Sequence, residues 1–572
     1  MLAPMFPILV ACGALLMLLV GYRFYSTYLA DRIFRLEDSE PVPSVEMEDG
    51  VDYVPTQPEV LWGHHFSSVA GAAPILGPAM AIVWGWAPAL AWIVIGVIFM
   101  GAAHDFGALV LSIRHGGQTI GNLTDKYISP RARVLFLLII FFLIWLVGAV
   151  FAFAIAGLFT KFPASILPVN LEILVAMGIG WWGYKMKRSL IIPSLAALVG
   201  LYLAIFGTAS GALWVPVEGS LFLSKDFWLV GLMVYAFVAS SLPVWFLLQP
   251  RDLINSHQLV VGLLALYIGF FLSSPSFVAP TVGELSALPT VFPLLFVTIA
   301  CGAISGFHGL VASGTTSKQL ARATDARPIG YGGMLAEAAL AILATMAVAC
   351  GLWNGVDHNH AWDYLHTQIS AGGEGVAMPL PQVGQALMAF VNGAASFLAS
   401  IGIPVQMGMT VVAVLVISFA ATSLDTALRV QRLVLAELGA IYKVRPLQNR
   451  WVGGAIAAGS VLILIYADYQ HGAKSLWPVF GATNQVLAAF TLLITALYLR
   501  GLGRRSASYA IPAVIVMAIT ITAMAVQVMR DFKDEKWLVT AVGAAIAVLT
   551  VWVALEGGLA WRRGKSETEP SS

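Results

Sequence analysis

Long apolar runs separated by short polar segments make up most of this sequence. A helix needs about 20 apolar residues to cross a bilayer, and fifteen runs are close to this length. They lie near 5–23, 66–86, 88–111, 132–159, 170–185, 189–213, 227–248, 257–273, 290–311, 333–353, 405–428, 451–466, 475–499, 507–529 and 537–558. This pattern predicts an all-α polytopic membrane protein with about 15 transmembrane helices.

The composition excludes a soluble or disordered chain. Hydrophobic residues make up 59% of the 572 residues and charged residues only 11%, whereas soluble domains are about 45–50% apolar and about 25% charged. The formal net charge is only +1, so we expect no nucleic-acid partner. The lipid bilayer is the partner that this composition predicts.

The distribution of basic residues orients the chain in the membrane. One further apolar stretch, 382–402, contains Asn392 and Gly393 and is followed by Pro404, so it is either a full span or a re-entrant segment. If it does not cross, 25 of the 31 lysines and arginines face the cytoplasm, as the positive-inside rule requires. We therefore predict fifteen spans, with the N-terminus outside and the C-terminus inside.

Prolines interrupt two of the predicted spans. Pro74 and Pro78 lie within 66–86, and Pro243 lies within 227–248. Each proline lacks an N–H group and so frees the backbone carbonyl one turn before it. A bare carbonyl is not tolerated in lipid, so we expect the freed carbonyls to line a cavity or contact another protein segment.

The two interrupted spans predict a five-plus-five inverted repeat. Four intact spans separate them, and by the charge rule they cross the membrane in opposite senses, which is typical of many transporters. We divide the chain into a first helix with a cytoplasmic loop (1–60), a first repeat (61–215), a second repeat (216–432) and four C-terminal helices with a short tail (433–572). The alternative is that the prolines only kink these helices.

Ionisable side chains at membrane depth are costly and point to function. They are His64, His65, His104, Asp105, His308, Glu337 and Asp425. A buried carboxylate or imidazole can carry the proton that drives transport. A set of hydroxyl groups can instead bind Na⁺: Ser313, Thr315 and Thr316. Two alternatives stay open, because Asp425 can pair with Arg429 one turn later and Glu337 can extend toward the interface.

The sequence predicts neither an enzyme nor a cofactor. It has no H-E-x-x-H, G-x-S-x-G or Walker A motif, so a protease, hydrolase or ATP-driven pump has no supporting pattern. His64, His65, His104 and Asp105 are metal-ligating residue types without the spacing of a metal site. A membrane sensor or metal-binding protein that uses the three histidines is a hypothesis from a different class.

Five long segments carry most of these features. They are GHHFSSVAGAAPILGPAMA (63–81), GAAHDFGALVLSIRHGGQTIGNL (101–123), ACGAISGFHGLVASGTTSKQL (300–320), FAATSLDTALRVQR (419–432) and LWPVFGATNQVLAA (476–489). Together they resemble hallmark motifs of the carbon starvation protein A (CstA) family, over about residues 60–500. The resemblance implies an inner-membrane carrier of peptides or pyruvate, with proton symport for pyruvate. It also implies the LeuT-like fold of the amino acid–polyamine–organocation superfamily.

The resulting hypothesis is a secondary transporter that imports pyruvate or short peptides by alternating access. The substrate is expected between the two interrupted helices, at Ser67, Ser68, Gly71, Pro74, Gly77, Ser240, Ser241 and Pro243. H⁺ coupling is assigned to His64, His65, His104, Asp105, His308 and Asp425, and Na⁺ coupling to Ser313, Thr315 and Thr316. A sodium-coupled amino-acid transporter of the same fold is the alternative. The first span and the spans within 451–558 are expected to form a scaffold or a homodimer surface.

Overall fold

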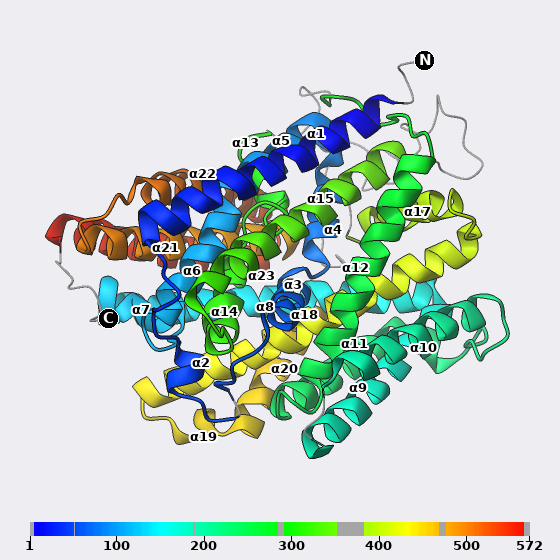
Figure 1. The fold of residues 1–572 in the computed structure, drawn as a ribbon, viewed down its shortest axis with the longest axis horizontal. Helices are drawn as coiled ribbons and strands as arrows, with labels where there is room; N and C mark the ends of the chain where they lie inside the picture. The colour runs from blue at the N-terminus through cyan, green and yellow to red at the C-terminus, as the bar shows by residue number, and fades with distance from the viewer. Residues whose placement is uncertain are drawn as a thin grey trace.

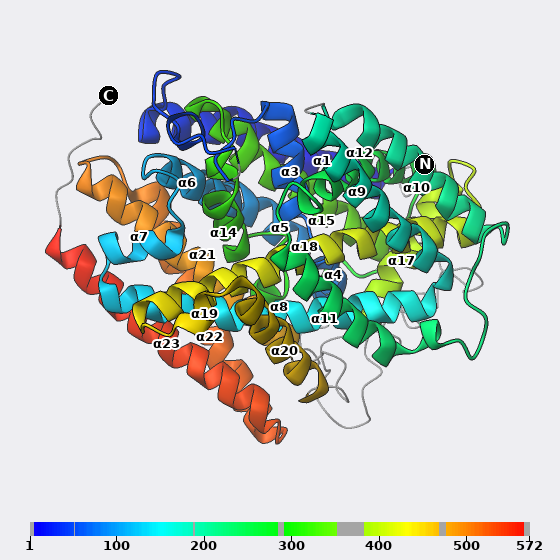
Figure 2. The same ribbon diagram turned by 90° about the horizontal axis from the view of Figure 1, so that it is seen from below.

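A computed structural model describes residues 5–50, 52–186, 189–283, 291–351, 383–467 and 476–564. Within these ranges the chain is helical, and its one extended pairing is an isolated parallel bridge between Thr56 and Leu320. Figure 1 shows a bundle of long helices in which α1 (Phe6–Val20) follows one edge. The long helices α8 (Pro130–Lys161) and α18 (Val405–Ile441) pack against each other and cross the middle of the bundle in Figures 1 and 2.

Twelve helices in these ranges are long and apolar enough to span a membrane, or thirteen if a bent pair counts as one span. They are Phe6–Phe34, Trp86–Ile113 (with α5, Trp86–Gly96, and α6, Ala102–Ile113), α8 (Pro130–Lys161), Pro163–Met186 (with α9, Ile166–Met186), α10 (Ile191–Ala209), α12 (Leu248–Leu272), Ala323–Cys350 (with α15, Gly332–Cys350), α18 (Val405–Ile441), α20 (Arg450–Ala467), α21 (Leu476–Gly501), α22 (Ala507–Lys533) and α23 (Trp537–Arg563). The multi-pass all-α prediction is confirmed.

The count of fifteen spans is not confirmed, because two predicted spans have a different form. The stretch 227–248 contains α11 (Lys225–Ser241), a helix of only 17 residues. The stretch 290–311 is divided between α13 (Val291–Thr298) and α14 (Gly306–Gly314). The ambiguous stretch 382–402 forms α17 (Val383–Ala399), which packs on α15 and α18. That α17 does not cross the membrane stays a prediction.

The first predicted interruption is present. Helices α3 (Pro58–Val69) and α4 (Ala73–Ala81) are joined through residues 70–72, and the pair is bent by 47°. Pro74 is in the first turn of α4, where a missing N–H costs no helical hydrogen bond. The proline therefore starts a new helix after the break.

The prediction of a single interrupted helix over 227–248 is wrong. α11 ends at Ser241, and Pro243 lies in the turn before α12. The carbonyl one turn before this proline, that of Ala239, is not bare: Arg429 Nη2 donates to it at 3.2 Å and to the Leu242 carbonyl at 2.6 Å. The proline ends α11, and the half-buried Arg429 binds the Ala239 carbonyl that it frees.

The second interrupted helix is α13–α14, which lacks a proline at its break. Residues 299–305 join the two helices, and Asn484 of α21 binds this junction. Its Oδ1 accepts from the Phe307 backbone N–H at 2.9 Å, and its Nδ2 donates to Ser305 Oγ at 3.0 Å. A Cβ on Gly306 would lie 2.3 Å from Leu487 Cβ. Close packing and side-chain hydrogen bonds from α21 thus stabilise this break.

Candidate functional site

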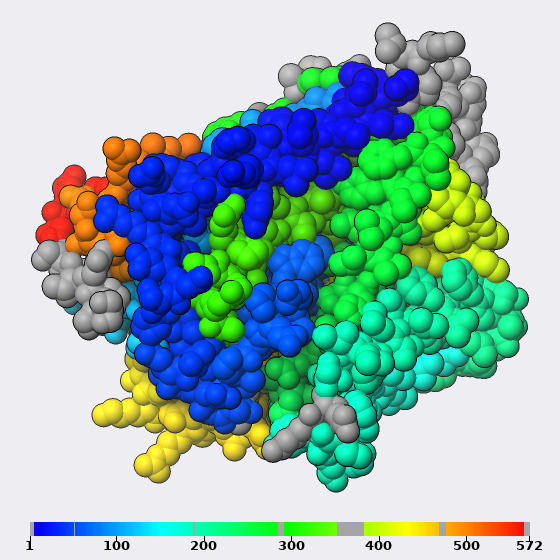
Figure 3. All heavy atoms as spheres, in the orientation of Figure 1, coloured from blue at the N-terminus to red at the C-terminus, as the bar shows by residue number. Residues whose placement is uncertain are grey.

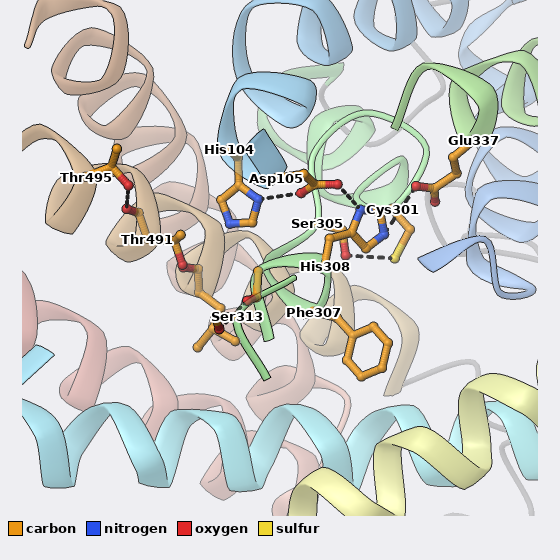
Figure 4. A network of polar contacts seen from close by, with 12 residues as sticks. His104, Asp105, Cys301, Ser305, Phe307, His308, Ser313, Glu337, Thr491 and Thr495 are labelled. Atoms are coloured by element: carbon orange, nitrogen blue, oxygen red, sulfur yellow. Dashed lines mark hydrogen bonds and ion pairs between the residues drawn. The ribbon is translucent and has the colours of Figure 1, made fainter. Parts of the chain in front are cut away.

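Four buried side chains form a connected network beside the break in α13–α14 (Figure 4). Asp105 accepts from two imidazoles: its Oδ1 is 2.7 Å from His104 Nδ1, and its Oδ2 is 2.9 Å from His308 Nδ1. The other nitrogen of His308, Nε2, is 3.2 Å from Glu337 Oε2, an ion-pair distance without good hydrogen-bond alignment. His308 therefore lies between two carboxylates.

The network joins three helices. His104 and Asp105 belong to α6, His308 to α14 and Glu337 to α15. A π-helical segment precedes each helix that supplies a carboxylate: Val97–Gly101 before α6 and Arg327–Tyr331 before α15. Such segments are rare and occur often at functional sites, because the extra residue re-aims the side chains that follow.

The hydrogen-bonding roles of Asp105, His308 and Glu337 depend on one another. A neutral imidazole has one N–H and one lone pair. If His308 Nδ1 donates to ionised Asp105, its Nε2 either accepts from protonated Glu337 or, as an imidazolium, donates to ionised Glu337. One proton lies between His308 and Glu337 in both arrangements. The network can therefore hold a proton and pass it between two helices.

The two breaks lie against each other close to this network. A Cβ on Gly77 of α4 would lie 2.7 Å from the Thr298 carbonyl at the end of α13. A Cβ on Gly309 would lie 3.0 Å from His104 Cε1. The backbone of Val69, the last residue of α3, interacts with the His308 ring. The broken helices are therefore in direct contact with the network.

Five of the predicted substrate residues lie at the α3–α4 break or within a few residues of it: Ser67, Ser68, Gly71, Pro74 and Gly77. Ser423 of α18 faces this break, since a Cβ on Gly71 would lie 2.4 Å from Ser423 Oγ. The Ser423 hydroxyl is buried and has no hydrogen-bond partner among the described residues. It is a polar group available to a ligand at the break, and sequence reasoning missed it.

The other three predicted substrate residues lie elsewhere. Ser240 and Ser241 end α11, and both hydroxyls donate to the Phe237 carbonyl of the same helix, at 3.0 and 2.9 Å. Pro243 follows in the turn. These residues lie where Arg429 of α18 contacts the end of α11.

A second buried polar cluster surrounds Arg251 and Asp425. Both side chains are 1% exposed and form an ion pair. Tyr235 joins them: its hydroxyl donates to Asp425 Oδ2 at 2.7 Å and accepts from Arg251 Nη1 at 2.5 Å. Arg251 is one of the 25 basic residues that the charge rule assigns to cytoplasmic segments outside the spans; that placement is wrong, because Arg251 lies inside α12. Asp425 pairs with Arg251, whereas Arg429 binds carbonyls.

The remaining histidines and hydroxyls have separate partners. His64 Nδ1 is 2.9 Å from Asp252 Oδ2, and His65 Nδ1 is 2.9 Å from Thr316 Oγ1. Ser313 donates to the Gly309 carbonyl at 2.6 Å, and Thr315 donates to the Val311 carbonyl at 2.9 Å. The described residues contain no group of three or more His, Cys, Asp or Glu side chains arranged for a metal ion.

The sequence leaves two alternatives for Glu337, a functional group at membrane depth or a side chain extending toward the interface. The second is wrong, since its side chain is fully buried and faces His308. The sequence does carry a signal for this burial: Glu337 lies one helical turn from the small residues Gly333 and Ala341, which indicates a helix face packed against other helices. Of the predicted coupling residues, the structure brings together His104, Asp105 and His308, and it places Asp425 in a different cluster.

A polar cavity lies beside α3 and contains several of the predicted residues. Its lining includes His64, Ser68, Asp252, Thr315 and Arg429. The segment before α3 closes over this side: Val54 N–H donates to the Lys318 carbonyl at 3.1 Å, and Thr56 N–H to that of Gln319 at 2.9 Å. Figure 3 shows the blue N-terminal segment spread over this face of the molecule.

Buried ionisable groups beside interrupted membrane helices are the features of a multi-pass membrane transporter. The chain belongs to the carbon starvation protein CstA family, whose model matches residues 6–523. The peptide transporter CstA of Bacillus subtilis is 31% identical over 513 residues, which cover 85% of this chain and 84% of the relative. The pyruvate/proton symporter BtsT of Escherichia coli is 30% identical over 577 residues, which cover 88% of this chain and 79% of the relative.

A solved structure also resembles part of this fold. The structure of MhsT in complex with L-phenylalanine aligns with a TM-score of 0.46 at 13% identity, covering 88% of this chain and 99% of that one. The assignment as a transporter, and not an enzyme, comes from the family and from the names of the sequence relatives.

Proposed function

We propose that this protein is a proton-coupled secondary transporter that imports pyruvate or short peptides by alternating access. The observation that carries the proposal is the position of His308, 2.9 Å from Asp105 and 3.2 Å from Glu337. The three groups are buried, and each comes from a different helix. Relatives named for peptide transport and for pyruvate–proton symport match this chain at nearly equal identity, so both substrates are retained.

The network supplies a physical basis for coupling. Separating α14 from α6 breaks the His308–Asp105 contact, and separating it from α15 breaks the His308–Glu337 contact. Either movement changes where the shared proton is held. Proton binding and helix position are then thermodynamically linked, and a ligand at the breaks that shifts helix position also shifts proton affinity.

We infer that the inverted repeats are 58–272 and 291–501, with α9 and α10 inserted into the first. Equivalent helices then make equivalent contacts: α12 packs on α3 as α21 packs on α13, and α15 packs on α4 as α6 packs on α14. Likewise α12 packs on α18 as α21 packs on α8. Under the predicted orientation, each helix runs opposite to its counterpart. These repeats replace the proposed 61–215 and 216–432.

The substrate site is proposed at the α3–α4 break, beside the α13–α14 break. The break places the positive end of the α4 dipole beside the end of α3. Pyruvate and peptides both carry a carboxylate, the group that such an end binds. Ser67 and Ser68 on α3 and Ser423 on α18 supply hydroxyl groups at the same place.

The polar cavity beside α3 is the proposed exit to the cytoplasm. Ser68 connects it to the break, and His64, Asp252 and Arg429 line it. The N-terminal segment covers this side and is held by Arg114, whose Nη2 is 2.7 Å from Glu40 Oε1. In this arrangement the cytoplasmic side is closed, and release requires the segment to separate from residues 318–320.

Uptake into proteoliposomes tests the proposal. Labelled pyruvate and a labelled dipeptide are supplied with an inward H⁺ gradient, and in parallel with an inward Na⁺ gradient. We expect the H⁺ gradient alone to drive uptake, and D105N to abolish it. E218Q, on an exposed loop, is the matched control and is expected to leave uptake unchanged.

Each result has a definite meaning. Uptake of the dipeptide alone assigns the protein to peptide transport, and uptake of pyruvate alone assigns it to carboxylate transport. Uptake driven only by Na⁺ contradicts proton coupling and favours the sodium-coupled amino-acid transporter. Absence of uptake of both substrates overturns the proposed substrates.

A further inference from the structure

A second cavity lies far from the breaks, where three helices end. It is lined by Lys126 and Tyr127 of α7 (Ile120–Tyr127), by Leu497 and Arg500 of α21, and by Trp561 and Arg563 of α23. In Figure 2 the C-terminal end of α23 lies beside α7. All three cations belong to segments that the charge distribution assigns to the cytoplasmic face. The cavity therefore opens at the level of the inner-leaflet headgroups.

The two arginines, Arg500 and Arg563, are exposed and do not pair with a carboxylate among the described residues. Arg500 lies over the Trp561 ring, with Cζ 4.5 Å from the ring centroid, which leaves the edge of its guanidinium open for hydrogen bonds. Lys126 Nζ is 3.0 Å from His115 Nε2. No acidic residue lines the cavity, and neither Arg500 nor Arg563 has a carboxylate partner in the described part of the chain.

A simpler role explains only part of this arrangement. Arg500 and Arg563 lie in the last turns of their helices, where a cation offsets the negative end of the helix dipole. That role accounts for one arginine at each helix end. It does not account for a lysine from a third helix, or for the aromatic and aliphatic floor formed by Tyr127, Trp561 and Leu497.

We propose that this cavity binds the phosphate headgroup of an anionic phospholipid from the cytoplasmic leaflet. Guanidinium groups match phosphate oxygens in geometry and charge, and basic pockets between membrane helices on the cytoplasmic side suit such headgroups. The glycerol and upper acyl carbons would then pack on Leu497 and Trp561. A free phosphate offers the same charge without the apolar part, so the lipid fits the whole lining better.

Native mass spectrometry of the full-length protein in detergent tests this site. The protein is incubated with phosphatidylglycerol, and in parallel with phosphatidylcholine, and the lipid retained per protein is counted. We expect wild type to retain phosphatidylglycerol selectively and R500Q/R563Q to bind it about tenfold more weakly or worse. R445Q/R450Q, which removes two other arginines from the predicted cytoplasmic face, is the control and should retain the lipid.

Two further arms distinguish the remaining possibilities. R500K/R563K keeps both charges and is expected to keep most of the retained lipid, which separates loss of charge from loss of fold. Inorganic phosphate that displaces phosphatidylglycerol would overturn the lipid assignment in favour of a soluble phosphate. Equal retention of phosphatidylcholine, or unchanged retention of phosphatidylglycerol by R500Q/R563Q, would overturn the site.

Discussion

At the scale of single residues, the protein has two buried ionic clusters with different properties. Around His308 two carboxylates flank one imidazole, and under the proposed function a proton shared by His308 and Glu337 balances their charge. Around Asp425 the charge is balanced by Arg251, a permanent cation. The first cluster is suited to carrying a proton, and the second is suited to holding α12 against α18.

The first prediction concerns Glu337. In E337Q the amide can donate to His308 Nε2 without a titrating proton, so the contact is kept and the shared proton is lost. We expect proton-driven accumulation of substrate to fall to the level of protein-free liposomes, while exchange of labelled for unlabelled substrate continues. Counterflow and gradient-driven uptake measured on the same vesicles check this. Retained accumulation would remove Glu337 from the coupling mechanism.

The second prediction concerns the Arg251–Asp425 pair. Breaking a buried ion pair leaves one uncompensated charge and costs about 3–5 kcal/mol, so R251Q and D425N are each expected to lower the stability in detergent strongly. The double variant removes both charges and should be less destabilised than the sum of the two. Thermal unfolding of the three variants gives the comparison. Additive effects would show that the pair does not act as a unit.

The sequence identifies most of these residues but not their partners. His104, Asp105 and His308 stand out because ionisable groups are costly in an apolar span, and the structure places them in one network. Glu337 has an equally plausible place at the interface, and only packing decides between the two. Arg251 is misread because charge counting treats every arginine near a span end as a loop residue.

At the scale of helices, the two breaks have different physical origins. Pro74 makes the break in α3–α4 a local property of the sequence, readable from the missing N–H. The break in α13–α14 depends on tertiary contacts: Asn484 binds the Ser305 hydroxyl and the Phe307 N–H. Such contacts have no signature within the segment itself. Proline positions therefore indicate a break at Pro243, where a helix ends, and give no sign of the break at 299–305.

The third prediction uses two glycines of α14. A Cβ on Gly309 would press on the His104 ring at 3.0 Å, whereas a Cβ on Gly314 would meet nothing within 4 Å. Small displacements of reacting groups cost much activity, so we expect G309A to reduce proton-driven uptake about tenfold or more. G314A tests whether alanine itself disturbs α14 and is expected to behave like wild type. Equal uptake by the two variants would contradict the role of His104.

At the scale of the whole molecule, transport as proposed requires the N-terminal segment to open the cytoplasmic side. The N-terminal segment pairs with residues 318–320 through backbone hydrogen bonds, and the polar cavity lies beneath it. Helices α8 and α18 pack centrally and extensively, so they are suited to remain fixed while the broken helices move. The multi-pass character of the chain follows from hydropathy alone, whereas this closure depends on contacts between distant segments.

The fourth prediction concerns access to Ser68, which lines the cavity. In a background with Cys12→Ser, the remaining native cysteines Cys301 and Cys350 are buried, so an introduced S68C is the reactive thiol of interest. We expect a membrane-impermeant maleimide applied to the cytoplasmic face to label S68C faster when substrate and a proton gradient are present. Labelling that is equally fast without substrate would show that this side is already open.

The protein is proposed to carry its substrate, bound at the α3–α4 break, into the cell together with a proton that is held by the His308 network. The most direct measurement records the internal pH of proteoliposomes with an enclosed dye after pyruvate or dipeptide is added without any imposed gradient. The account predicts rapid internal acidification with wild type, beyond that of protein-free liposomes, and none beyond that level with E337Q. Accumulation of labelled substrate by wild type without acidification would contradict it.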